Sequence, residues 1–467
     1  MKTKLIPIML ALLLLPLLGQ ATHLYSGHIS YDTDPQNPRT FHFVLTLFTY
    51  SASPAEDPFI NISMGDGVTL RVDRKSVTKF GIHYDKELFT WTYTFPAAGT
   101  YTVAWVAENR NGGIINLAAP SDMLSFHVIT ELKVNPLAQN LHGAKLAGSP
   151  IVEAFTGEPW THNLLAYDAD GDYLAYELVP PKHRYPTGTT GNAPGYWIPD
   201  GLTVNEFGEL HWENPGAKGQ YVLVLRVTEM RNGRVLGAME VEFTFFVRDR
   251  SDQPKLSLIN KERLTVNDDG SIQVWPGQPV KLEFYMQKSP GSDLPLMAKE
   301  FGELDTLRLA ETSLAFRDTA EGFAVTYTFT PSPALERPEP YLIGVRGNVI
   351  EKLSSGQVEW GKVGNVWAFA YLYVGGPRRS LSAGDRFPIC KPKLYPNPIA
   401  DRFTLVAPQL PSLYLQLLDL NGRVVAGNTL EPGQNTIPRP ASLAKGLYLY
   451  TLTSRQKPLS SGKLVLQ

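Results

Sequence analysis

The stretch best suited to chemistry is a run of three aspartates at alternate positions, Asp168, Asp170 and Asp172. Ca²⁺ takes six to eight oxygen ligands at about 2.3–2.6 Å, and alternate carboxylates converge on one ion where the backbone turns sharply. The glycine between the last two aspartates permits such a turn. The run therefore predicts a calcium site. Glu158 and Glu229 lie near expected strand ends, and we predict that they complete the ligand set.

The same run has a second interpretation, a polar turn that merely joins two strands, because Asp and Gly are common turn residues. An EF-hand is excluded, since the flanking helices and the glutamate at the twelfth position are missing. Calcium site and polar turn both stay open at this point.

A second candidate is the long loop between Pro180 and Pro199, which carries Tyr185, Tyr196 and Trp197 among several glycines. Aromatic rings on such a loop can stack on a sugar or grip a peptide. They can equally fold back over the core of their own domain. The loop predicts a binding site for an extracellular glycan or protein, with core capping as the alternative.

Residue patterns typical of enzymes are missing or incomplete. The segment Gly356–Lys362 has the spacing of a phosphate-binding loop, but Val363 stands where Ser or Thr would hold Mg²⁺. The nine histidines form no zinc motif, and no Gly-x-Ser-x-Gly occurs. We expect a non-enzymatic protein without catalytic residues. The alternative is a secreted hydrolase with an unrecognised site.

The composition is that of a globular chain with several domains. A length of 467 residues is more than one core usually supports. With 43% hydrophobic and 19% charged residues the chain is not disordered. A net charge of −2 argues against a nucleic-acid partner, which would require a basic surface.

The N-terminus has the pattern of a secretory signal. Lys2 and Lys4 precede the apolar stretch Leu5–Leu18, and small residues lead to Ala21, which predicts a signal peptide over residues 1–21. The apolar stretch is too short to span a bilayer comfortably, so we expect no transmembrane segment in the mature chain. The single cysteine, Cys390, excludes an intramolecular disulfide.

Between its two ends the chain alternates short apolar or aromatic runs with turn residues, which predicts an all-β fold of tandem β-sandwiches. The expected domains cover residues 22–130, 131–250 and 251–376. A linker, 377–392, and a small β-sandwich, 393–467, follow. The only helix expected lies within Leu296–Ser313.

Two domains resemble known families. The Gly65-Asp66-Gly67 turn, followed by the strand Gly99–Val103, resembles polycystic-kidney-disease-like immunoglobulin sandwiches, although Met64 replaces the usual Trp. The order of motifs in residues 131–250, including the aspartate run, is similar to the cadherin-like or putative-Ig domains of bacterial surface proteins. These resemblances imply immunoglobulin-like sandwiches. The third domain resembles no family beyond a generic sandwich.

The last 75 residues carry four motif blocks in a fixed order. The motif residues are Tyr395, Pro396, Asn397, Pro398, Asp419, Asn421, Gly422, Gly446, Tyr448 and Lys463. Asn421-Gly422 is a two-residue hairpin signal. The blocks closely resemble the C-terminal sorting domain of the type IX secretion system of the Bacteroidetes. This resemblance implies the type IX secretion machinery as a partner, and the cell surface or the extracellular medium as the destination.

Two tripeptides, Asp305-Thr306-Leu307 and Asp318-Thr319-Ala320, resemble the Asp-Thr-apolar sequence that some Bacteroidetes O-glycosylate. Thr306 and Thr319 are therefore candidate glycosylation sites. The sequence as a whole predicts an exported binding or adhesion protein. A structural spacer without a ligand of its own is the alternative.

Overall fold

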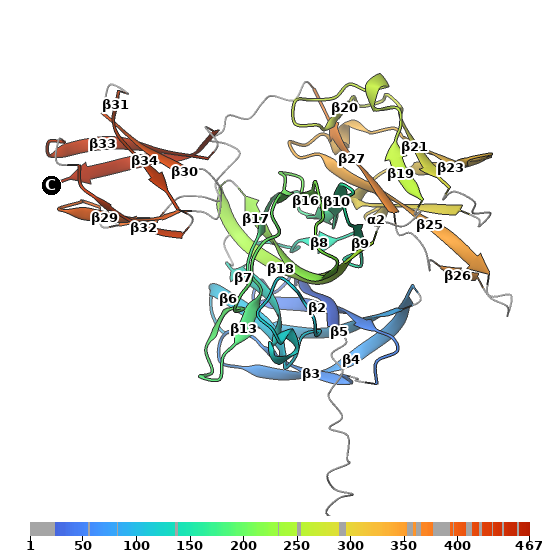
Figure 1. Cartoon of the computed structure of the whole chain (residues 1–467), viewed down its shortest axis with the longest axis horizontal. Helices are drawn as coiled ribbons and strands as arrows, with labels where there is room; N and C mark the ends of the chain where they lie inside the picture. The colour runs from blue at the N-terminus through green and yellow to red at the C-terminus, as the bar shows by residue number, and fades with distance from the viewer. Residues whose placement is uncertain are drawn as a thin grey trace, which may run out of the picture. The chain divides into compact units, whose positions relative to one another are not determined.

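The computed structural model describes residues 24–467 apart from 55–56, 82, 136–138, 232, 250–253, 289–295, 353–357, 361–365, 377–392, 396, 408–412, 420–422, 432, 441–442 and 455–456. The expected signal peptide, the linker and Cys390 lie outside the described residues. The chain divides into two compact units, Met1–Arg378 and Arg379–Gln467 (Figure 1). Among the described helices, none has both the length and the apolar character needed to cross a membrane.

Nearly all described elements are strands, which confirms the all-β fold class (Figure 1). The first domain contains β1 (Leu24–Thr33), β2 (Thr40–Tyr50), β3 (Phe59–Ser63), β4 (Thr69–Phe80), β5 (Tyr84–Thr94), β6 (Gly99–Ala107), η1 (Ser121–Met123) and β7 (Phe126–Val134). Along β2, Phe41, Phe43, Leu45 and Leu47 are each at most 2% exposed. Successive side chains of a strand point to opposite faces, so these four alternate side chains of β2 all point into the core.

The first sheet is closed by a strand from the second domain. The strand order runs β1-β2-β5-β4-β3-β6-β7, and β18 (Arg234–Arg248) then pairs with both β7 and β1. Gly237 lies opposite Leu132 of β7, and Glu242 lies opposite Gly27 of β1. The domain boundary expected at residue 130 falls inside β7. The first two domains therefore share a strand.

The second domain contains β8 (Lys145–Leu146), β9 (Glu153–Phe155), β10 (Trp160–Asn163), β11 (Ala166–Tyr167), β12 (Tyr173–Leu178), β13 (Lys182–Arg184), β14 (Thr190–Asn192), β15 (Leu202–Val204), β16 (Glu209–Trp212), β17 (Gly219–Arg231) and β18. Its core lies between the β12-β17-β18 side of the large sheet and the small sheet β10-β16-β15. Trp160 stacks on Phe245 across this core, with the two ring centroids 5.2 Å apart.

The third domain contains β19 (Lys255–Leu258), η2 (Lys261–Arg263), β20 (Ile272–Val274), β21 (Val280–Gln287), β22 (Leu296–Gly302), α2 (Glu303–Thr306), β23 (Thr312–Thr319), β24 (Gly322–Phe329), η3 (Pro333–Leu335), β25 (Tyr341–Lys352), β26 (Val358–Trp360) and β27 (Val366–Val374). The sheets β19-β21-β24-β23 and β20-β27-β25-β22 enclose one core.

The helix expected within Leu296–Ser313 is wrong for most of that range. Leu296–Gly302 forms β22, which pairs with β25 along seven residues, and only the single turn α2 is helical. The cause is tertiary pairing, which outweighs the local helix propensity of this segment.

The second unit contains β28 (Lys393–Tyr395), β29 (Arg402–Ala407), β30 (Leu413–Leu418), β31 (Val424–Leu430), β32 (Gly433–Pro438), β33 (Gly446–Ser454) and β34 (Lys457–Leu466). Its two sheets, β28-β29-β32 and β31-β30-β33-β34, close over a core that includes Phe403, Leu415 and Leu464.

Candidate functional site

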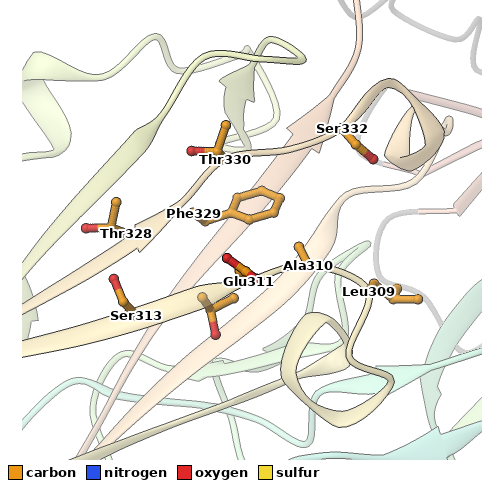
Figure 2. Close-up of a pocket in the computed structure, with 9 residues that line it drawn as sticks. Leu309, Ala310, Glu311, Ser313, Thr328, Phe329, Thr330 and Ser332 are labelled. Atoms are coloured by element: carbon orange, nitrogen blue, oxygen red, sulfur yellow. The ribbon is translucent and has the colours of Figure 1, made fainter.

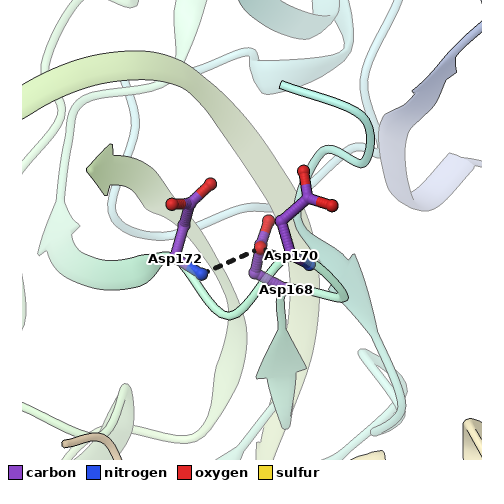
Figure 3. A group of neighbouring side chains, drawn as sticks. All are labelled: Asp168, Asp170 and Asp172. Carbon is purple, nitrogen blue, oxygen red and sulfur yellow. Dashed lines mark hydrogen bonds between the residues drawn. The ribbon is translucent and has the colours of Figure 1, made fainter. Parts of the chain in front are cut away.

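The aspartate run forms the turn between β11 and β12, and its three carboxylates lie together (Figure 3). One ligand atom from each of Asp168, Asp170 and Asp172 lies within 4.8 Å of the others. Asp168 Oδ1 accepts the backbone N–H groups of Asp170 at 2.9 Å and Asp172 at 3.0 Å. Gly171 takes φ of 76°, a left-handed conformation that glycine adopts without steric cost. Asp168 therefore organises the turn that gathers the other two carboxylates.

Burial sets the electrostatics of this turn. Asp168 is 4% exposed, and its buried Oδ2 has no hydrogen-bond partner among the residues that the structure describes. This burial raises the pKa of Asp168 to about 7, and the neighbouring charges of Asp172 and Asp170 add to the rise. Desolvation penalises the charged form of a carboxyl, and nearby like charges do the same.

The two predicted completing ligands lie outside this group. Glu229 is 1% exposed. It accepts the N–H of Ala144 at 2.6 Å, the Asn140 amide at 2.6 Å and the Tyr31 hydroxyl at 3.3 Å. Burial raises the pKa of Glu229 to about 8. Glu158 sits in the turn between β9 and β10, where its N–H donates to the carbonyl of Phe155. The structure thus gathers three of the five predicted ligands.

A residue that the sequence did not single out completes the cluster. Arg231, the last residue of β17, donates from Nε and Nη2 to the two carboxylate oxygens of Asp172, both at 2.7 Å. The same guanidinium lies 3.4 Å from Asp170 Oδ2. A Ca²⁺ ion held by all three aspartates would have to displace it. Calcium binding stays a prediction from the sequence.

The aromatic loop folds largely onto its own domain. Tyr185 donates its hydroxyl to the carbonyl of Asn192 at 2.8 Å and lies edge-on to His183. Tyr196 packs against the buried cluster around Leu117, and its hydroxyl is itself buried. Only Trp197 is well exposed, at 46%. Of the three predicted ligand-contacting rings, Trp197 alone presents a large free surface.

A groove of about 520 Å³ lies at the start of β23 in the third domain (Figure 2). Its lining consists of Leu309, Ala310, Glu311, Thr312, Ser313, Thr328, Phe329, Thr330 and Ser332. Ser313 of β23 lies directly opposite Thr328 of β24. Sequence reasoning missed this groove because alternating threonines on β24 look like any solvated strand face. The available signal was the repeat at 326, 328 and 330.

A buried group near the junction of the first two domains combines residue types found in hydrolases. Ser125 Oγ lies 3.0 Å from His127 Nε2 and 3.1 Å from His183 Nδ1. Ser125 is 5% exposed, and its Oγ also accepts the N–H of Arg184. Burial lowers the pKa of His127 to about 3. These groups satisfy one another in the interior, as a structural polar network does.

The predicted modification sites differ in access. Thr306 is exposed at the end of α2. Thr319 lies at the end of β23, where its hydroxyl is 3.0 Å from the Tyr285 hydroxyl. A free hydroxyl is needed for a glycosidic bond, so Thr306 is the better placed of the two.

The described sorting-motif residues stabilise strand ends in the second unit. Asn397 accepts the N–H of Val465 at 2.9 Å and donates to the carbonyl of Lys463 at 3.0 Å. Asp419 accepts the N–H of Arg423 at 2.9 Å. The remaining described motif residues are Tyr395 on β28, Pro398 before β29, and Gly446 and Tyr448 on β33. Pro396, Asn421 and Gly422 lie outside the described residues.

Comparison with known proteins assigns the tail. Residues 393–467 match the family model described as "Secretion system C-terminal sorting domain". No curated protein matches the chain. The match confirms the sorting domain predicted from the motif blocks.

Solved structures give only distant likenesses. The two immunoglobulin domains of DIP-gamma are 11% identical, with a TM-score of 0.19 over 46% of this chain and 98% of theirs. Human protocadherin-24 EC1-2 is 15% identical, with a TM-score of 0.16 over 50% and 98%. The S-layer protein rSbsC(31-844) is 12% identical, with a TM-score of 0.15 over 94% and 66%. TM-scores this low add nothing to the β-rich architecture that the sheets show directly.

The tail fixes the destination of the chain. A type IX sorting domain directs export to the cell surface or the extracellular space. The chain thus carries a C-terminal sorting domain of the type IX secretion system behind tandem β-domains.

Proposed function

We propose that the first unit of this exported protein binds an extracellular glycan without catalysing a reaction. The observation that carries this proposal is the groove at the start of β23 (Figure 2). Its volume of about 520 Å³ falls in the range of small-ligand sites. The position of the groove on an exported domain would give it access to extracellular ligands.

The lining chemistry favours a polyhydroxylated ligand. Five hydroxyl side chains line the groove, namely those of Thr312, Ser313, Thr328, Thr330 and Ser332. Each hydroxyl both donates and accepts hydrogen bonds, while Glu311 adds an acceptor when ionised. None of the described lining residues is basic, so a strongly anionic ligand fits poorly. A neutral oligosaccharide matches this mixture of donors and acceptors.

The test is a binding array of glycans and matrix proteins probed with the full secreted chain. The proposal expects saturable binding to a glycan class that Glu311→Gln weakens about tenfold or more. Glu321→Gln is the matched control, because Glu321 is an exposed acid in the β23–β24 turn outside the groove lining. Glycan binding that both variants leave unchanged would show that the glycan does not bind in the groove.

Two other outcomes lead to different functions. Binding to a matrix protein that Trp197→Ala abolishes would move the ligand site to the aromatic loop. An absence of saturable binding by the full chain would favour a structural spacer, the alternative predicted from the sequence.

Export is tested separately. Deletion of residues 393–467 is expected to leave the protein in the periplasm, because the secretion machinery no longer finds its signal. Fractionation of cells that produce the intact and the truncated chain checks this. Equal surface display of both chains would contradict the role of the tail.

A further inference from the structure

The guanidinium of Arg231 lies against two of the three clustered aspartates, Asp172 and Asp170. Nε and Nη2 bind Asp172 Oδ1 and Oδ2 in a two-pronged arrangement, both at 2.7 Å. This planar fork matches the geometry of a carboxylate and gives strong, oriented ion pairs. Both oxygens of Asp172 are therefore already engaged.

The remaining contacts of Arg231 reach two other chain segments. Nη1 donates to the carbonyl of Gln139 at 2.9 Å, and Nη2 lies 3.5 Å from Asn140 Oδ1 and 3.4 Å from Asp170 Oδ2. The guanidinium thus meets two carboxylates, one backbone carbonyl and one amide oxygen. A hard cation such as Ca²⁺ binds these same kinds of oxygen.

Most carboxylate oxygens of the run are engaged as well. Asp170 Oδ2 accepts the N–H groups of Leu141 at 2.8 Å and His142 at 3.0 Å. Asp168 Oδ1 accepts two further N–H groups within the turn. Ca²⁺ requires about six to eight oxygens. With Arg231 in place the cluster does not offer them, so the described residues do not fit a bound calcium ion.

The segment that Arg231 contacts is itself fastened to the first domain. The N–H of Thr33 on β1 donates to the carbonyl of Leu141 at 2.7 Å, and the N–H of Gly143 donates to the carbonyl of Tyr31 at 3.0 Å. Arg231 therefore links the end of β17, the aspartate turn and the connecting segment that β1 holds.

We propose that Arg231 is a tethered cation that takes the place of calcium, so that the first and second domains are joined without a bound metal. The charge that the aspartate run requires is supplied by a side chain of the same fold. The cluster then holds the first and second domains together through ion pairs and hydrogen bonds, whereas the sequence pattern alone suggested a metal site.

The test uses the full secreted chain and two variants. Thermal unfolding is followed in millimolar CaCl₂ and in chelator, and calcium binding is measured by titration calorimetry. Arg231→Gln removes the charge and the fork. Arg234→Gln is the matched control, because Arg234 is exposed and lies opposite Arg231 in the same hairpin.

The proposal expects identical melting of the wild type in calcium and in chelator, with no saturable heat. Arg231→Gln should melt several degrees lower in chelator and recover part of this loss in calcium, because the carboxylates are then free for an ion. Arg234→Gln should behave as the wild type.

Saturable calcium binding by the wild type, with a higher melting temperature, would overturn the proposal. So would an Arg231→Gln variant that melts like the wild type in chelator. If Arg231→Gln fails to fold, the calcium response of the wild type still decides between the two cations.

Discussion

Two junctions between domains of the first unit differ in the chemical character of their buried side chains. The junction between the first and second domains combines a shared strand with buried ionisable groups, including Glu229, Asp168 and the Arg110–Glu242 ion pair. The junction between the second and third domains is a cluster of apolar side chains. One chain thus joins neighbouring β-domains by two different physical means, which respond differently to pH and to salt.

The apolar junction centres on four buried residues, Leu165, Phe207, Leu342 and Tyr371. His162 adds edge-on contacts to Trp367 at 5.7 Å and to Phe369 at 5.8 Å. Removal of apolar area from water drives such contacts, and this driving force is roughly proportional to the area buried. We therefore expect this junction to depend on pH only through His162. Burial lowers the pKa of His162 to about 4, so stability falls as pH drops from about 6.5 to about 4.

The largest effect is expected at the charged junction, from Arg110→Met. Arg110 is 1% exposed and forms an ion pair with Glu242, which is 2% exposed. Removal of one partner leaves the other charge buried without compensation, which costs about 3–5 kcal/mol of unfolding free energy. Chemical denaturation measures the loss.

The double variant Arg110→Met/Glu242→Leu sharpens this prediction. Replacement of both charges by apolar groups of similar size should recover most of the stability. A double variant as unstable as the single one would show that the cost lies in packing rather than in the unpaired charge.

The next effect belongs to the apolar junction. Leu165→Ala removes a buried side chain from the cluster with Phe207 and Tyr371, and we expect a loss of about 2–4 kcal/mol from lost burial and the cavity left behind. The same loss should appear in urea at low and at high salt. A loss that shrinks strongly in high salt would contradict the apolar character assigned to this junction.

The sequence predicted what depends on local pattern. Alternation along β2 and β5 gave the all-β fold, and the motif blocks of the tail gave the sorting domain. The pairing of β18 with β1 joins residues more than 200 positions apart, and no local pattern encodes it. From Met239 to Phe245, β18 alternates apolar residues with Glu240, Glu242 and Thr244, which is typical of a strand with one solvated face. The burial of these three polar residues could therefore not be predicted from the sequence.

The candidate site was predicted only in part, for the same reason. Asp168, Asp170 and Asp172 are neighbours in the sequence, so their convergence follows from one turn. Arg231 lies 59 residues from Asp172, and its position depends on the register of β12 on β17. A sequence pattern can show that carboxylates gather, but not which cation meets them.

A smaller effect is expected from pH at the charged junction. Burial raises the pKa of Asp168 from 3.8 to about 7 in the folded state. The folded chain then holds a proton that the unfolded chain releases, so stability falls as pH rises from about 4 to about 7. Glu229, whose pKa burial raises to about 8, acts in the same direction.

Asp168→Asn should flatten this pH profile, because the neutral amide cannot lose a proton. Between pH 5 and pH 8 we expect the wild type to lose about 2–3 kcal/mol more unfolding free energy than the variant loses. Urea unfolding across this range is the measurement. Parallel profiles for variant and wild type would show that Asp168 is ionised throughout.

The smallest effect is expected from Tyr371→Phe at the apolar junction. The Tyr371 hydroxyl donates to Glu209 and lies 3.4 Å from the Asn163 amide. Glu209 is only partly buried, so water can replace the lost hydrogen bond, and the ring that fills the cluster stays. A loss of about 0.5–1 kcal/mol of unfolding free energy follows.

Tyr31→Phe is the matched change at the charged junction, where Tyr31 donates to Glu229 and both residues are at most 3% exposed. Water cannot reach Glu229 there, so Tyr31→Phe should cost at least twice as much in the same denaturation assay. Equal losses for the two variants would mean that buried polar groups contribute no more to the first junction than to the second.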